Sequence, residues 1–173
     1  SDIKHSTQAE IFTLDNGLRV VLRQVPDCGL VSMVMVSEGG VLLEDKSTNG
    51  LGMLATTLST RGTKNYTADE IGEFFSRAGG SIAAECGNNT YYWRASTLAD
   101  QFPQALEIFS EVILHPTFPQ KELEILRPRM LAAVDRTDED WHSEAMKFFR
   151  GKFFAGSPYQ LLPIGRKEVI GSA

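Results

Sequence analysis

The segment LVSMVMVSEGGVLLEDKSTNGLGMLATTL (residues 30–58) decides the fold, because the spacing of its apolar residues changes from that of a strand to that of a helix. Residues 30–36 are apolar on both faces of an extended chain, which is typical of a central strand covered on each side. The later apolar residues recur at helical spacing: Leu51, Leu54, Ala55 and Leu58. They predict an amphipathic helix with its N-cap near Thr48 or Asn49.

Toward the N-terminus, a β-hairpin is predicted. Residues 11–14 and 18–22 are two short runs rich in alternating apolar residues, and Asp15-Asn16-Gly17 separates them. Asn-Gly readily adopts the positive φ angles that a tight hairpin turn requires.

Toward the C-terminus, the pattern predicts a helix, two strands and then further helices. Thr67 and Glu70 have the spacing of a capping box, so a helix is expected to begin there, with its apolar stripe on Ile71, Phe74, Phe75 and Ala78. Strands are predicted over 81–86 and 90–97. The expected later helices have these features: a cap at Asp100 with a stripe of Phe102, Leu106, Phe109 and Ile113; a start at Pro119 with a kink at Pro128; and a last run over 141–154.

This order predicts an α+β fold, with helices packed on an antiparallel or mixed sheet. The 173 residues suit a single domain (1–173), and 42% hydrophobic with 23% charged residues excludes a disordered chain. The net charge of −5 and the absence of a basic patch exclude a nucleic-acid-binding role. No apolar run is long enough for a membrane span, and the first residues lack a signal peptide.

Read without reference to any family, the residues show no active site. His142 and Glu144 are two apart and do not share a helix face, and Asp138-Glu139-Asp140 is expected to be a solvated charge run. Cys28 and Cys86 are expected to be two isolated buried thiols, with a disulfide as the alternative. One functional hypothesis is an enzyme with an unrelated site that uses Cys86 near Asn88 and Tyr91. It is disfavoured because no base accompanies the thiol.

Seven short motifs occur in an order that resembles the pitrilysin/insulinase family of zinc peptidases, the inverzincins. They are Leu14-Asp15-Asn16-Gly17-Leu18-Arg19-Val20, Ser37-Glu38-Gly39-Gly40, Asn49-Gly50-Leu51-Gly52, Arg61-Gly62-Thr63, Gly79-Gly80-Ser81, His115-Pro116-Thr117-Phe118-Pro119, and Ser157-Pro158-Tyr159 through Pro163-Ile164-Gly165. Each motif is weak alone, but together they span residues 14–165. The resemblance implies one lobe of a pitrilysin-type half.

Active members of that family carry H-x-x-E-H on the helix between the motifs that correspond to Asn49-Gly50-Leu51-Gly52 and Arg61-Gly62-Thr63, where two His bind zinc and the Glu is the general base. The resemblance places Met53 and Thr57 at the histidine positions and Thr56 at the base position. It places Ala133 where a Glu on the long helix is the third ligand. No catalytic, cofactor-binding or metal-binding residue is therefore expected on this chain.

The resemblance implies a non-catalytic lobe that walls a peptide chamber and partners a zinc-bearing half, which would hold the zinc and hydrolyse the peptide substrate. The alternative is a purely structural scaffold subunit of a larger assembly without peptidase activity. Residues 1–173 resemble a truncated lobe, since family lobes continue with further strands, and an unpaired strand edge is expected. Analogy with exported bacterial relatives suggests the periplasm, with the cytoplasm as the alternative.

Overall fold

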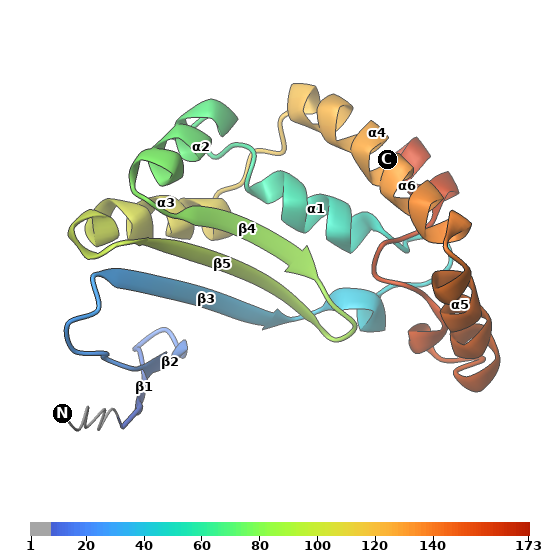
Figure 1. Ribbon diagram of the computed structural model, residues 1–173, viewed down its shortest axis with the longest axis horizontal. Helices are drawn as coiled ribbons and strands as arrows, with labels where there is room; N and C mark the ends of the chain where they lie inside the picture. The colour runs from blue at the N-terminus through green and yellow to red at the C-terminus, as the bar shows by residue number, and fades with distance from the viewer. Residues whose placement is uncertain (1–7) are drawn as a thin grey trace.

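The computed structural model describes residues 8–173. Its strands form two antiparallel sheets (Figure 1). One is a hairpin of β1 (Glu10–Thr13) and β2 (Arg19–Leu22), and the other has the order β3 (Leu30–Glu38), β5 (Thr90–Leu98), β4 (Ser81–Cys86). The predicted hairpin is confirmed, with Gly17 at φ 85° in its turn.

The helices form a layer on one face of the larger sheet (Figure 1). Their bounds are α1 Leu51–Ser59, α2 Ala68–Arg77, α3 Phe102–Leu114, α4 Gln120–Glu139, α5 Trp141–Phe153 and α6 Lys167–Ser172, with short 3₁₀ helices η1 Gly40–Leu43, η2 Ala99–Gln101 and η3 Pro158–Gln160. Helices α1 and α2 contact β4, and α3 contacts β5. This arrangement confirms the predicted α+β class. Within residues 8–173, no helix combines the length and apolarity needed to cross a bilayer.

Two apolar clusters lie beneath the helices. The first joins α2 and α3 to the sheet and contains Ile71, Phe74, Phe75, Ala78, Ala95, Ala105, Ile108, Phe109 and Val112. The second joins α1 to α4 and α6 and contains Leu54, Leu58, Leu126, Met130, Val134 and Ile170. The second cluster therefore fixes α1 against the long helix.

Three of the sequence-based predictions for strands and apolar stripes are wrong. The strand β3 is not central but lies at an edge of its sheet, and Leu30, Val34 and Val36 are exposed. On α1, Leu54 and Leu58 are buried whereas Leu51 and Ala55 are exposed, because α4 and α6 cover only one side of the helix. On α3 the stripe is likewise rotated, so that Leu106 is exposed.

Of the predicted helix starts, that of α2 is confirmed and those of α1 and α3 are wrong. The capping box is confirmed, since the Thr67 hydroxyl accepts from the Glu70 backbone N–H and the Glu70 carboxylate accepts from the Thr67 N–H. The N-cap of α1 is Gly50, that of α3 is Gln101 and that of α4 is Pro119, so the expected caps at Thr48 or Asn49 and at Asp100 are wrong. The caps of α1 and α3 make no side-chain cap hydrogen bond. Helix α4 continues through Pro128.

The buried side chain of Leu54 is expected to stabilise the fold substantially. Leu54→Ala would leave a cavity between α1 and α4 and should lower the free energy of unfolding by about 2–5 kcal/mol. Leu51→Ala, the same change on the same helix at an exposed position, is the matched control and should cost less than about 1 kcal/mol. Chemical denaturation measures both, and equal losses would contradict the placement of Leu54 in the core.

Candidate functional site

Helix α1 carries the positions that the family resemblance singles out, and its N-terminus is held by a buried carboxylate. Glu44 accepts hydrogen bonds at Oε2 from the Asn49 side-chain amide (2.9 Å) and the Gly50 N–H (3.2 Å), and at Oε1 from the Gly52 N–H (2.8 Å). The two backbone N–H groups, of Gly50 and Gly52, are donors that the start of a helix leaves without partners. A carboxylate at this end also suits the helix dipole.

The chain approaches closely around this carboxylate. Gly50 has φ 107°, a left-handed conformation that glycine adopts readily. A Cβ on Gly52 would lie 2.8 Å from the Tyr91 ring and 2.9 Å from a Glu44 oxygen. Sequence analysis missed Glu44, because only its place five residues before Asn49-Gly50 marks it.

The side chains at the three predicted motif positions of α1 are buried or half-buried: Met53, Thr56 and Thr57. Met53 packs against the cluster between α1 and α4. The hydroxyl of buried Thr56 donates to the Gly52 carbonyl oxygen (2.8 Å) within the helix. Thr57 is half-buried. The Thr56 hydroxyl is therefore engaged by the backbone, as Ser and Thr hydroxyls in helices often are.

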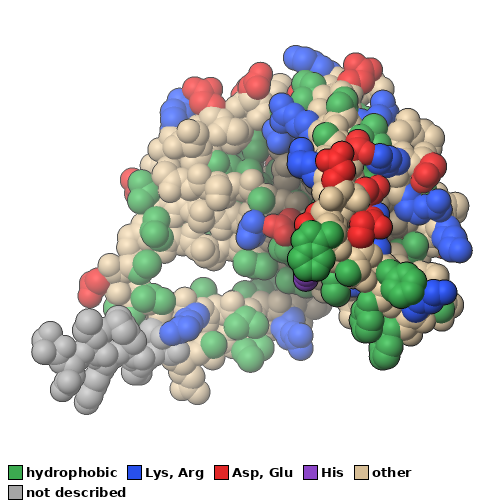
Figure 2. Space-filling model, turned by 45° about the vertical axis from the view of Figure 1, so that its right-hand side comes forward, with side chains coloured by type: hydrophobic (Ala, Val, Ile, Leu, Met, Phe, Trp, Pro, Cys, Tyr) green, Lys and Arg blue, Asp and Glu red, His purple; other side chains and the backbone are tan. Residues whose placement is uncertain are grey.

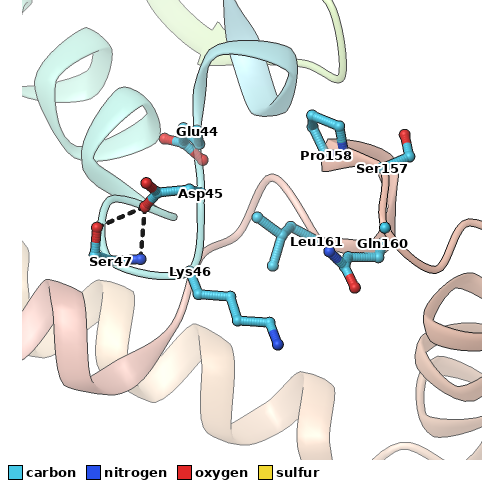
Figure 3. A pocket seen from close by; sticks show the side chains of 9 residues that line it. Glu44, Asp45, Lys46, Ser47, Ser157, Pro158, Gln160 and Leu161 are labelled. Carbon is cyan, nitrogen blue, oxygen red and sulfur yellow. Dashed lines mark hydrogen bonds between the residues drawn. The ribbon is translucent and has the colours of Figure 1, made fainter.

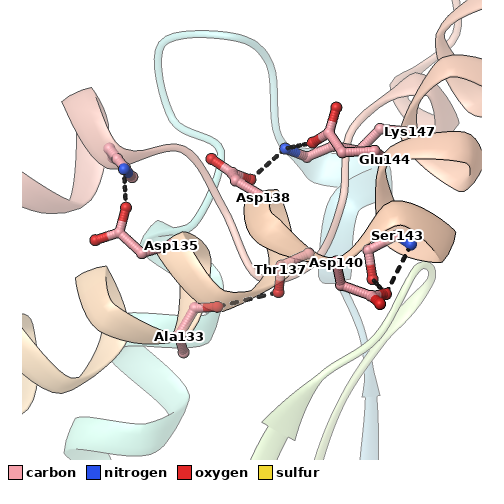
Figure 4. Close-up of polar contacts among 9 residues, drawn as sticks. Ala133, Asp135, Thr137, Asp138, Asp140, Ser143, Glu144 and Lys147 are labelled. Atoms are coloured by element: carbon pink, nitrogen blue, oxygen red, sulfur yellow. Dashed lines mark hydrogen bonds and ion pairs between the residues drawn. The ribbon is translucent and has the colours of Figure 1, made fainter.

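The fourth predicted position, Ala133, lies on α4 next to buried Val134 and is half-buried itself (Figure 4). Its carbonyl oxygen accepts from the Thr137 hydroxyl at 3.0 Å. Because Val134 and Met53 adjoin the same apolar cluster, the structure brings the two helices that carry the four positions together.

These residues do not fit a zinc ion. Zinc in proteins takes imidazole, thiolate or carboxylate ligands, and a thioether, a hydroxyl and a methyl group are not substitutes for them. Among residues 8–173, no group of three or more His, Cys, Asp or Glu side chains is arranged to hold a metal. The four positions thus offer neither the ligands nor the base that metal-assisted hydrolysis would require.

The acidic run at the end of α4 is engaged in local contacts (Figure 4). Asp140 caps α5 and accepts from the Ser143 N–H (2.9 Å) and hydroxyl (2.7 Å), which lowers the pKa of its carboxyl group. Lys147 pairs with Asp138 and with Glu144, and the hydrogen bond that its ammonium group donates to the Asp138 carboxylate is the main cause that raises the pKa of Lys147. The pair of Lys147 with Asp138 joins α5 to α4.

A pocket with a volume of about 490 Å³ lies between the segment before α1 and the region of η3 (Figure 3). Its lining residues are Glu44, Asp45, Lys46, Ser47, Gly156, Ser157, Pro158, Gln160 and Leu161. Asp45 accepts from the Ser47 hydroxyl (2.6 Å) and N–H (2.7 Å), which lowers the pKa of its carboxyl group. A smaller pocket of about 210 Å³ includes His142 and Ser143. None of Met53, Thr56, Thr57 and Ala133 lines either pocket.

The two cysteines differ, which corrects the expectation that both are buried. Both are free thiols, but Cys28 is exposed whereas Cys86 is buried on β4. Burial, with the charge of Glu44 adding to it, raises the pKa of the Cys86 thiol to about 11. A thiol protonated at neutral pH is a poor nucleophile, which disfavours the enzyme hypothesis based on Cys86.

A thiol-specific disulfide reagent should therefore distinguish the two cysteines. At about pH 8 one thiol, Cys28, is expected to react within minutes, and Cys86 only after denaturant is added. Cys28→Ser should abolish the fast phase, and Cys86→Ala should leave it unchanged. A fast phase of two thiols in the native chain would contradict the burial of Cys86.

The chain is similar to several known proteins. Residues 19–160 match the family model described as Insulinase (Peptidase family M16). The chain is 26% identical over 165 residues to an uncharacterized zinc protease, YmxG, of Bacillus subtilis, covering 93% of this chain and 39% of that protein. It is 28% identical over 131 residues to the mitochondrial-processing peptidase subunit alpha of Neurospora crassa, covering 76% of this chain and 22% of that one.

Among solved structures, the peptidase M16 inactive domain from Pseudomonas fluorescens superimposes with a TM-score of 0.87 at 17% identity, covering 95% of this chain and 40% of that chain. At this identity the likeness shows the fold alone. The chain spans well under half the length of each of these relatives.

Proposed function

The chain belongs to the insulinase family, peptidase family M16, and from that premise we propose that it is a non-catalytic lobe that helps to wall a peptide-holding chamber. In this proposal it positions peptide for a zinc-bearing half, which lies in the same polypeptide or in another subunit. That half holds the zinc and carries out hydrolysis. The present chain contributes shape and contacts and takes no part in the chemical step.

The observation that supports this proposal most directly is the state of α1. Its motif positions hold Met53, Thr56 and Thr57, and the Thr56 hydroxyl is bonded to its own helix backbone. Ala133 on α4 adds no donor to the set. Glu44 fixes the N-terminus of α1, and α4 and α6 cover its apolar face, so protein contacts alone hold this helix in place.

The relatives support pairing with a second unit. One of them is named as the alpha subunit of a processing peptidase, and a similar structure is described as an inactive domain. A lobe without zinc ligands can serve peptide hydrolysis only by acting beside a lobe that has them.

Elemental analysis and a peptide assay test the first half of the proposal. The purified chain, dialysed against zinc, is expected to retain far less than one zinc per chain and to leave an unstructured fluorogenic peptide uncut. One tightly held zinc per chain, or cleavage that a chelator abolishes, would overturn the assignment of Met53, Thr56, Thr57 and Ala133.

Purification of the partner tests the second half. We expect a stoichiometric partner, or a further segment of the same polypeptide, that contains H-x-x-E-H, and chelator-sensitive peptide hydrolysis by the complex. A stable complex that contains no such motif and hydrolyses no peptide would instead establish the alternative, a structural scaffold subunit.

A further inference from the structure

The chain contains two Asn-Gly dipeptides, Asn16-Gly17 and Asn49-Gly50, in opposite surroundings. An asparagine side chain is open to attack by the backbone nitrogen of the next residue. This attack is least hindered when the next residue is glycine, which has no side chain. Because the remaining asparagines precede Tyr66, Asn89 and Thr90, these two dipeptides are the positions of the chain most prone to lose a side-chain amide group.

The loss of the amide group needs water and no other reactant. The glycine nitrogen bonds to the side-chain carbonyl carbon of the asparagine, and the bond from that carbon to the NH₂ group breaks. The NH₂ group leaves as ammonia with the proton of the glycine N–H. Water then opens the cyclic imide at either of its carbonyl carbons, which gives aspartate, or isoaspartate with a longer main chain that runs through the former side chain.

The dipeptide Asn49-Gly50 is protected by buried hydrogen bonds. Asn49 is 1% exposed, and its NH₂ group donates to Glu44 Oε2 (2.9 Å) and to the Leu162 carbonyl oxygen (2.9 Å). The attacking nitrogen is held as well, since the Gly50 N–H donates to the same carboxylate oxygen (3.2 Å). Both reacting groups must lose these partners before the ring can form, which requires the start of α1 to open.

The dipeptide Asn16-Gly17 lies in an exposed turn that is held by local contacts. The Leu18 N–H donates to Asn16 Oδ1 (3.0 Å), and the Gly17 N–H donates to the Leu14 carbonyl oxygen (2.8 Å). These bonds join residues at most three apart, and residues 14–18 are all exposed. The turn can therefore open to the reacting geometry without disturbing an apolar core.

A further strand beside the β1–β2 hairpin would leave this turn uncovered. The pairing of β1 with β2 ends at Thr13 and Arg19, so the turn lies beyond the ladder. A strand added along either edge would pair with residues 10–13 or 19–22 and not with the turn. The hairpin also projects from the body of the molecule (Figure 2).

We propose that Asn16 is a site of spontaneous deamidation and that the fold protects Asn49 in the same dipeptide. An aspartate product at position 16 adds a negative charge beside Asp15 to a chain whose net charge is already −5. An isoaspartate product lengthens the main chain between the two strands, and turn geometry sets the register of a hairpin. Deamidation therefore loosens the β1–β2 pairing as the protein ages.

Peptide mapping of the full chain tests the proposal. The folded chain is incubated at mildly alkaline pH, and mass spectrometry with fragmentation that separates aspartate from isoaspartate measures conversion at both positions. We expect Asn16 to convert at least about tenfold faster than Asn49, because Asn49 reacts only in molecules whose α1 start has opened. In concentrated urea the two positions should convert at similar rates, since the contacts that distinguish them are lost. The two dipeptides are thus matched controls for each other.

Two variants separate the contributions of the turn and of the buried carboxylate. Asn16→Gln should remove the fast conversion, because the longer side chain forms a ring more slowly, and should leave Asn49 unchanged. Glu44→Ala should accelerate the conversion of Asn49 and leave that of Asn16 unchanged, and circular dichroism shows whether this variant is folded. Equal rates at the two positions of the folded parent, conversion of Asn16 only in urea, or an unchanged rate for Asn49 in folded Glu44→Ala would each overturn the proposal.

Discussion

A variant with Met53→His, Thr57→His and Ala133→Glu is expected to bind one zinc ion per chain. The two new imidazoles would lie one turn apart on α1, at the i, i+4 spacing that places side chains on the same helix face. The new carboxylate would come from α4, which shares an apolar cluster with α1. Two His and one Glu are a ligand set of catalytic zinc sites.

The main control for this experiment is a variant that keeps Ala133. Met53→His with Thr56→Glu and Thr57→His supplies two ligands and the base but lacks the third ligand. If each protein ligand contributes about 3 kcal/mol to zinc binding, the variant with Ala133→Glu should bind zinc about a hundredfold more tightly than the variant that keeps Ala133. Competition with a chromophoric chelator measures both affinities.

An isosteric control separates charge from shape. The three-site variant with Ala133→Gln in place of Ala133→Glu has the same size without the carboxylate and should lose most of the added affinity. Circular dichroism must show that all variants fold, since Thr56 is buried and a glutamate there is the riskiest change. Equal zinc affinities with Ala133 and with Glu at that position would refute the assignment of the third ligand position.

Local signals in the sequence were sufficient for much of the fold. The hairpin depended on Asn16-Gly17 and the start of α2 on Thr67 and Glu70, and in both cases the interacting groups are at most three residues apart. Such contacts form in almost any tertiary setting. The predicted strands β4 and β5 were bounded equally well by Gly87 and its neighbours.

Features that depend on distant neighbours were not predictable in this way. The apolar run of β3 indicates that it can be buried on both faces, but it does not indicate whether a strand lies beside it. The buried side of α1 is set by α4 and α6, so the choice of Leu54 over Leu51 could not be made from helical spacing alone. Both errors arise from tertiary contacts.

The candidate site was found through the family pattern and not through its own chemistry. Met53, Thr56, Thr57 and Ala133 are unremarkable side chains, and only their positions relative to the glycine motifs identify them. Glu44 was missed because its partners, which include two backbone N–H groups of a helix start, are invisible until the chain is folded.

Glu44→Ala is expected to be among the most destabilising single substitutions in this chain. It would leave the Asn49 amide and the Gly50 and Gly52 N–H groups without their acceptor in a region where Glu44 itself is 7% exposed. A buried donor left unpaired costs about 1–3 kcal/mol, so three of them should lower the free energy of unfolding by about 4–6 kcal/mol. That is a large share of the stability of a typical domain.

The effect should extend beyond the start of α1. The Asn49 amide also donates to the Leu162 carbonyl oxygen (2.9 Å), and the Arg166 N–H donates to the Asn49 carbonyl oxygen (3.1 Å). The carboxylate thus holds a residue that connects the α1 start to the segment before α6. Amide hydrogen exchange should consequently increase in both regions in Glu44→Ala.

Two further variants show whether the carboxylate acts as an acceptor. Glu44→Gln keeps one oxygen but turns an NH₂ group toward backbone donors, so it should recover less than half of the lost stability. Glu139→Ala, which removes an exposed carboxylate at the end of α4, should change stability by less than about 0.5 kcal/mol. If Glu44→Ala were as mild as Glu139→Ala in urea denaturation, the α1 start would not depend on this carboxylate, and the order of that helix would need another explanation.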